Sequence, residues 1–230
     1  MNAPVNSFRT PLGLQNLIEA WKTFGAESFP PPAHEDELRK LEAHLEQPIP
    51  SDLRALYSVT NGAHLRDGNL KFDPVEGHEI CLMESTIWLR NVGWCILDQV
   101  LVFGGNGSNE LFGIWLAPTL NAAFCNPIIQ VGGIFERGSG CMAVEATNLL
   151  SFLAIRTAGY FLFLDERPTK ALDHLGLPQE LRFDVNDASD DQLENLGQWA
   201  DPQMPDDVLG NPYTDGYDAK ELEKIFNEVS

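Results

Sequence analysis

Residues 33–65 read AHEDELRKLEAHLEQPIPSDLRALYSVTNGAHL and decide the fold of the first third of the chain. Apolar residues recur in this segment at helical spacing, and a Pro-Ile-Pro sequence interrupts them. The pattern predicts one helix within residues 29–47, entered through the prolines at 30–32, and a second with Ser51 as its N-cap, which ends where Gly62 supplies a left-handed cap. The first of these helices has a stripe of Leu38, Leu41 and Leu45 that we expect to be buried.

The regions on either side of this segment add another helix and a set of strands. Upstream, residues 10–25 predict a helix with Thr10 as its N-cap. Downstream, residues 64–77 are typical of turns, and a helix capped at Thr147-Asn148 and running to about Gly159 is expected to be buried on several sides. Residues 160–164 either continue that helix or form a further strand. Apolar runs predict strands at 79–83, 93–104, 110–116, 127–133 and 141–146.

The sequence from about Pro168 onward has little periodicity and is rich in Pro, Gly, Asp and Asn. Its end differs, because Asp218 and Glu221 have capping-box spacing ahead of an amphipathic helix that we expect to dock on its own domain. The apolar face of this helix consists of Leu222, Ile225, Phe226 and Val229. The sequence therefore predicts a domain over residues 1–167 and an acidic C-terminal extension over 168–230, packed on or beside it.

The charge is strongly negative and unevenly distributed. The formal net charge is −19, and twelve acids against one base between Asp173 and Asp218 account for −11 of it. Such a chain repels nucleic-acid phosphates and anionic lipids, and it attracts basic surfaces. We therefore expect no direct binding to nucleic acid or membrane.

The four cysteines and the N-terminal sequence indicate the compartment. The cysteines show no CxxC spacing and lie in apolar runs, which predicts reduced thiols. The first ten residues, MNAPVNSFRT, lack the features of a signal peptide. We therefore expect a cytoplasmic protein; its oligomeric state stays open.

The Gly-rich stretch over residues 100–116, VLVFGGNGSNELFGIWL, raises the question of a phosphate-binding loop. It lacks the third glycine of a dinucleotide fingerprint and the Gly-Lys-Ser/Thr of a Walker loop, and strand-like residues follow it where a helix is required. The pattern predicts a hairpin instead, with Asn106 and Gly107 supplying positive φ angles.

The other searches for chemistry identify no site. No serine stands in a nucleophile elbow, and no histidine has a second His or Cys three or four residues away. The segment that starts at Asp184 fails the EF-hand pattern, because Ser189 stands where glycine is required. We therefore predict no catalytic residues, no cofactor and no metal.

The order of these elements, together with several residues, resembles the SUKH superfamily, which includes the Smi/Knr-type regulators. The resemblance covers roughly residues 33–159, including the Gly-rich hairpin and the strand and helix over 142–154. It departs from the family at residues 109–112, where Asn-Glu-Leu-Phe replaces Asp-x-Tyr/Phe, and the acidic region after Pro168 has no counterpart in the minimal domain. The entry segment matches at Leu41, Glu42, Ile49, Pro50, Asp52, Leu53, Arg54, Tyr57, Asn61 and Gly62.

The resemblance implies an α+β fold, with helices against a mixed, mainly antiparallel sheet, and no catalytic residues. Bacterial members of the superfamily are commonly immunity proteins that neutralise polymorphic or contact-dependent toxins, and fungal members are interaction modules in signalling. The residues expected to act as a structural motif are Pro50, Asp52, Leu53, Tyr57, Asn61, Gly62, Gly105 and Gly107.

Three functions follow as hypotheses. The first is an immunity protein that binds a toxin with a basic surface, such as a nuclease, because an acidic inhibitor imitates a nucleic-acid backbone and accelerates encounter. The second is a regulatory or scaffold module with a host protein partner, and the third is a small-ligand or nucleotide binder that uses the Gly-rich hairpin. The expected partner-binding residues are Asp187, Asp190, Asp191, Glu194, Asp206 and Asp207, with Trp199 as an aromatic anchor.

Overall fold

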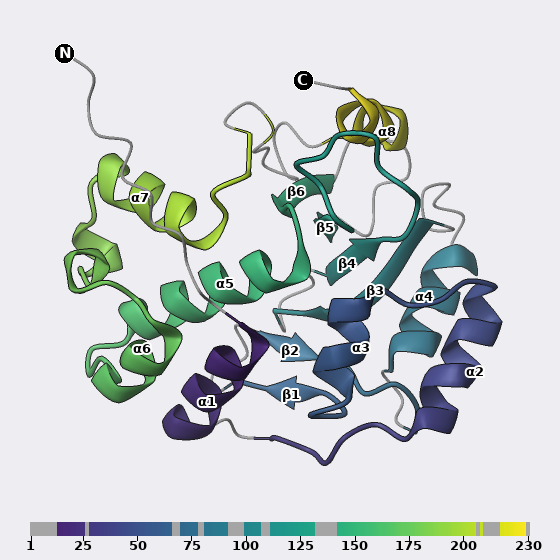
Figure 1. Cartoon of the computed structure of the whole chain (residues 1–230), viewed down its shortest axis with the longest axis horizontal. Helices are drawn as coiled ribbons and strands as arrows, with labels where there is room; N and C mark the ends of the chain where they lie inside the picture. Colours follow the sequence, from purple (N-terminus) through teal and green to yellow (C-terminus); the bar gives the residue numbers. More distant parts are fainter. Residues whose placement is uncertain are drawn as a thin grey trace.

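The fold consists of an antiparallel sheet with helices against both of its faces (Figure 1). The strands of this computed structural model follow one another in the order β1-β2-β3-β4-β5-β6, and every pair of neighbours runs antiparallel. The α+β class is confirmed, and the described strands contain no parallel pair, so the sheet there is antiparallel and not mixed. The structure describes residues 13–25, 28–65, 70–77, 81–91, 99–106, 111–131, 142–205, 208 and 217–228.

The three N-terminal helices are present, but their caps differ from those expected. Gly13 is the N-cap of the first helix, so the assignment of Thr10, which lies outside the described residues, was wrong. The third helix has Pro50 at its N-cap in place of Ser51, and it ends well before Gly62. The helices are α1 (Leu14–Phe24), α2 (Glu35–Leu45) and α3 (Ser51–Tyr57).

Two elements of the middle region differ from the prediction. The turn-like residues 64–77 contain part of β1 and all of β2, which are two residues long each, too short to show a period of two. The strand predicted at 79–83 was wrong, because Leu82 begins the helix α4 (Leu82–Asn91). The strands are β1 (Ala63–His64), β2 (Lys71–Phe72), β3 (Val100–Gly105), β4 (Leu111–Trp115), β5 (Ile128–Val131) and β6 (Met142–Ala146).

The apolar helix α5 (Leu149–Phe163) begins where the sequence indicated. The Asn148 side chain caps it by accepting a hydrogen bond from the Ser151 amide, 3.0 Å away. Residues 160–163 continue the helix, which settles the alternative between helix and strand. Ten of its fifteen residues are buried, since the sheet lies on one side and further helices lie on others.

The acidic region after Pro168 is largely helical. Apolar residues of α6 and α7 belong to the same buried cluster as α1 and α5. The terminal helix α8 docks on the opposite face of the sheet, as expected, with Leu222 and Phe226 fully buried and Asp218 capping it. The elements are α6 (Thr169–Leu175), two 3₁₀ turns at Gln179–Leu181 and Val185–Asp187, α7 (Asp190–Ala200) and α8 (Ala219–Asn227).

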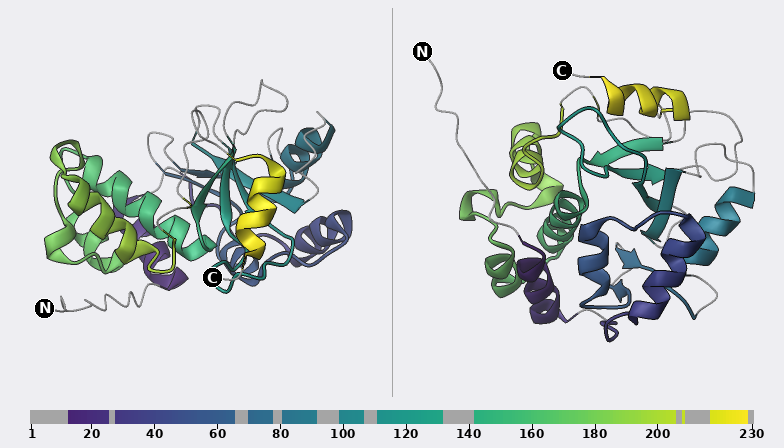
Figure 2. Two further views of the ribbon diagram at one scale, coloured as in Figure 1. Left: turned by 90° about the horizontal axis from the view of Figure 1, so that it is seen from above. Right: turned by 45° about the vertical axis from the view of Figure 1, so that its right-hand side comes forward.

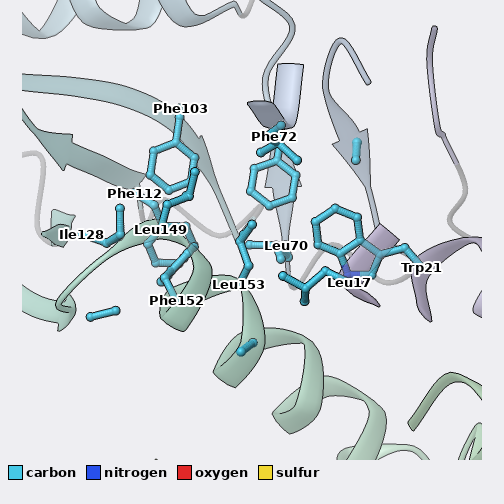
Figure 3. Packing of buried hydrophobic residues seen from close by; sticks show 14 of the residues in the cluster. Leu17, Trp21, Leu70, Phe72, Phe103, Phe112, Ile128, Leu149, Phe152 and Leu153 are labelled. Atoms are coloured by element: carbon cyan, nitrogen blue, oxygen red, sulfur yellow. The ribbon is translucent and has the colours of Figure 1, made fainter. Parts of the chain in front are cut away.

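The two faces of the sheet bury two separate apolar clusters. One face packs against α5, where Phe103, Phe112 and Phe152 meet with ring centroids 4.9–5.7 Å apart (Figure 3). On the other face Trp115 and Phe226 lie 5.1 Å apart, under α8. The views in Figure 2 show α1, α5, α6 and α7 gathered away from α8, so helices cover the sheet from two sides.

Candidate binding surface

Four of the acids predicted for partner binding lie in the described residues, around the start of α7. Ser189 caps this helix, and its hydroxyl accepts a hydrogen bond from the Gln192 amide at 3.3 Å. Acids in a first helical turn interact favourably with the helix dipole, so Asp190 and Asp191 also stabilise the helix that presents them. The side chains of Asp187, Asp190, Asp191 and Glu194 are all exposed, and we call these four the acidic face.

Two corrections apply to the predicted residues. Trp199 is 2% exposed and belongs to the buried cluster between α7 and α5, so it is not an anchor for a partner. We predicted no helix at these residues from the sequence, whereas in the structure α7 places Trp199 on the same side as buried Leu196. Asp206 and Asp207 lie outside the described residues.

Two arginines that precede the acidic face in the sequence pair with other acids and so do not neutralise it. Arg182 pairs with Asp173 at 2.7 Å, and Arg167 lies 3.5 Å from Asp184. Within the described ranges, none of the four acids of the acidic face forms an ion pair. Leu193, 42% exposed, lies on the same helix beside Glu194, so an apolar side chain accompanies the charge.

A buried polar link holds α7 to the sheet and α5. The Asp201 carboxylate, 8% exposed, accepts a hydrogen bond from the Thr147 amide at 2.7 Å and another from the Thr147 hydroxyl at 2.6 Å. Sequence reasoning missed this link, and its only signal was an acid directly after the apolar Trp199-Ala200 pair. The link fixes the acidic face relative to the start of α5.

The entry segment forms a network that joins α2, α3 and β2. The Tyr57 hydroxyl is fully buried and donates to the Asp73 carbonyl at 2.6 Å, while the Asn61 side chain accepts from the Val75 amide at 2.9 Å. Gly62 has a φ of +97°, and a Cβ there would lie 2.9 Å from the Phe72 carbonyl oxygen. Of the other expected motif residues, Leu53 is buried, Pro50 and Asp52 are half-buried, and Gly107 lies outside the described residues.

Arg54 ties α3 to α2 through two carboxylates. It lies 2.6 Å from Glu42 and 2.9 Å from Glu35, and Glu42 also accepts a hydrogen bond from the Ile49 amide at 3.1 Å. The hydrogen bond from Arg54 lowers the pKa of Glu42, against the effect of burial. This network is structural, because its members are satisfied by one another.

A cavity of about 700 Å³ opens beside the entry segment and is lined by groups of both charges. Nearby, burial raises the pKa of Asp73, and the Lys71 ammonium 3.1 Å away opposes that rise. No group of three metal-ligating side chains occurs within the ranges that the structure describes. The residues that line the 700 Å³ cavity include Pro30, Pro31, Pro32, His34, His64 and Lys71.

The Gly-rich stretch forms the β3–β4 pair, with Gly105 opposite Leu111. Asn106 does not have the positive φ that we expected, since the connection spans five residues and is not a two-residue turn. Gly104 is required for another reason: a Cβ there would lie 2.0 Å from the Lys71 carbonyl oxygen of β2. The element that follows the glycines is strand β4, whereas a phosphate-binding loop needs the N-terminus of a helix at this place.

This order of helices, antiparallel sheet and closing helix defines a SUKH-type α+β domain. The chain belongs to the SMI1/KNR4 family (SUKH-1), whose family model matches residues 32–155. Domains of this family typically bind protein partners. No curated protein matches the chain. Helices α1, α6, α7 and α8 lie outside the matched residues, and none of the helices in the described part of the chain is long and apolar enough to cross a membrane.

Proposed function

We propose that this protein is a non-enzymatic, cytoplasmic immunity protein that binds and neutralises a toxin with a basic surface, such as a nuclease. The observation that carries the proposal is the acidic face, four exposed carboxylates on a helical element that a SUKH-type domain holds in place. Unpaired acids on an ordered surface attract a basic partner over long range and accelerate its association. The net charge of −19 acts in the same direction.

The test is protection by the full chain against the product of the neighbouring toxin-like gene. We expect a complex whose affinity falls steeply with ionic strength, and the variant D187N/D190N/D191N/E194Q to lose most of it. The matched control is D36N/E46Q/E84Q/E223Q, which removes the same formal charge from exposed acids outside α7. If both quadruple variants bind equally, net charge and not the acidic face determines the interaction. If the wild type forms no complex at low salt, the proposal is wrong.

The family name favours one alternative, a regulatory or scaffold module that binds a host protein. Gene neighbourhood separates the two functions, because an immunity gene lies next to the gene of its toxin. A gene with no toxin-like neighbour, whose loss changes a host process, would support the regulatory module.

A further inference from the structure

Helix α5 has one stripe of residues that the fold does not bury completely. Ile155 and Gly159 are half-buried and Phe163 is 56% exposed, and they follow one another at spacings of four, so they share one face of the helix. The neighbouring positions of the same helix are mostly buried. The stripe on α5 is therefore an apolar surface that the rest of the described chain does not cover completely.

The stripe forms one wall of a cavity of about 480 Å³. Val185 of the second 3₁₀ turn and buried Tyr160 add further apolar wall, and Asn106, directly after β3, adds a polar rim. The space beside Gly159 is open, because a Cβ at this position would meet no atom within 4 Å. A glycine in the middle of a helix lowers the stability of that helix relative to alanine, so having glycine at this position costs stability.

The charged groups in the cavity do not favour an anion. Arg156 forms an ion pair with Glu145, and its guanidinium lies 4.8 Å from the centre of the Phe112 ring. Because Glu145 neutralises it, a phosphate or carboxylate gains little attraction there. Apart from the polar rim at Asn106, the rest of the lining is mainly apolar, which suits an apolar side chain.

The surroundings of the cavity are acidic. Asp187 lies two residues from Val185, and Asp165 and Glu166 lie two and three residues beyond Phe163; all three are exposed. Within the described residues none of these three acids has an ion pair. The cavity is thus an apolar depression among uncompensated carboxylates, and the 3₁₀ turn that lines it leads directly into the acidic face on α7.

We infer that this cavity receives a single large apolar side chain, aromatic or long aliphatic, from a partner segment in which lysines or arginines flank that side chain. The inference rests on the proposed function and adds to it the anchor of the interface. Interfaces of this kind concentrate affinity in a few buried apolar anchors, while surrounding charges control encounter and orientation.

Two peptides test the inference: acetyl-Lys-Lys-Trp-Lys-Lys-amide and its counterpart with Ala in place of Trp. Each is titrated at low ionic strength into ¹⁵N-labelled full chain. We expect the Trp peptide to bind about tenfold more tightly, because burial of one aromatic ring corresponds to at least that factor. Its shifts should centre on the amides of Gly159, Phe163 and Val185.

The variants G159L and F163S should abolish the advantage of the Trp peptide, by filling the cavity and by removing its exposed wall. The control is A55L, which adds the same kind of bulk at an exposed position of α3 and should retain the advantage. Both positions tolerate substitution, since Gly159 has open space and Phe163 is exposed, and the two variants act independently.

The outcomes separate the inference from the proposed function. Equal affinity of the two peptides, or an advantage of Trp that survives in G159L and F163S, overturns the cavity as an anchor. If both peptides bind equally and only the quadruple variant of the acidic face loses them, the proposed surface stands without the anchor. If neither peptide binds at low salt, the cavity as an anchor is overturned, and the proposed function is decided separately by the complex with the toxin.

Discussion

Helices α7 and α8, which both follow the residues of the family match, attach to the domain in different ways. Helix α7 is positioned by a buried polar link, in which both oxygens of Asp201 accept hydrogen bonds from Thr147. Helix α8 is held by aromatic contacts, with the Phe226 ring 5.0–5.1 Å from the rings of Phe124 and Trp115, and by the backbone amides of Leu120 and Asn121, which donate to the Phe226 carbonyl at 3.0 Å. Apolar contacts supply stability with little directional preference, whereas two hydrogen bonds to one carboxylate fix an orientation. The helix followed by the buried carboxylate link is the one that presents the acidic face.

The largest loss of stability should come from removing the aromatic contacts that hold α8. Phe226→Ala removes a fully buried ring and leaves a cavity, so we expect a loss of about 3–5 kcal/mol in the free energy of unfolding. Chemical denaturation measures the loss, and hydrogen exchange shows whether the α8 amides lose protection first. The matched control is F163A, a change at a ring that is 56% exposed, which should cost far less. Equal losses in the two variants would contradict the described docking of α8.

The polar attachment should be the next most sensitive. Asp201→Ala leaves the buried amide and hydroxyl of Thr147 without their acceptor, which costs about 2–3 kcal/mol. D201N keeps one acceptor oxygen and should recover part of this loss. An unchanged denaturation midpoint for D201A would show that the link contributes nothing, and partner binding by D201A tests whether it also orients the acidic face.

The sequence predicted one of these attachments and missed the other for a physical reason. The spacing of Leu222 and Phe226 together with the Asp218 cap is local, so periodicity identified α8 and its apolar face. The contact between Asp201 and Thr147 joins residues 54 positions apart, and no local pattern specifies it. For the same reason the acids of α7 could be named from composition, while the burial of Trp199 could not.

The same distinction explains the errors in the sheet and the cavity. β1 and β2 have two residues each and are defined by their partners, so neither has a period of its own. The cavity beside Gly159 depends on Val185, which reaches α5 only through the tertiary fold. Its single local signal was a glycine inside an otherwise strongly apolar helix.

A smaller effect on stability is expected from the Arg54–Glu42 ion pair between α3 and α2, and it should depend on pH. Arg54 lowers the pKa of Glu42 in the folded chain, so the pair stabilises the protein above the ordinary pKa of glutamate, and this contribution is lost as pH falls through the lowered value. Both side chains are partly exposed, which limits the contribution to about 1 kcal/mol. E42Q should therefore be less stable than wild type at pH 7, and the difference should shrink in acid. A difference that stays constant from pH 7 to pH 3 would contradict the ion pair.

The smallest effect on stability is expected in α5, the helix that packs against both the sheet and α7. Gly159→Ala should raise the free energy of unfolding by about 0.5–1 kcal/mol, because alanine is the better helix former and its Cβ meets open space. Gly197→Ala provides the comparison within α7, where a Cβ also meets nothing within 4 Å, and should give a similar gain. Thermal denaturation measures both. If G159A stabilises the chain while G159L weakens binding of the Trp peptide, then glycine at this position serves the cavity at a cost to the helix; if G159A is destabilising, the space beside α5 is not open and the anchor has no room.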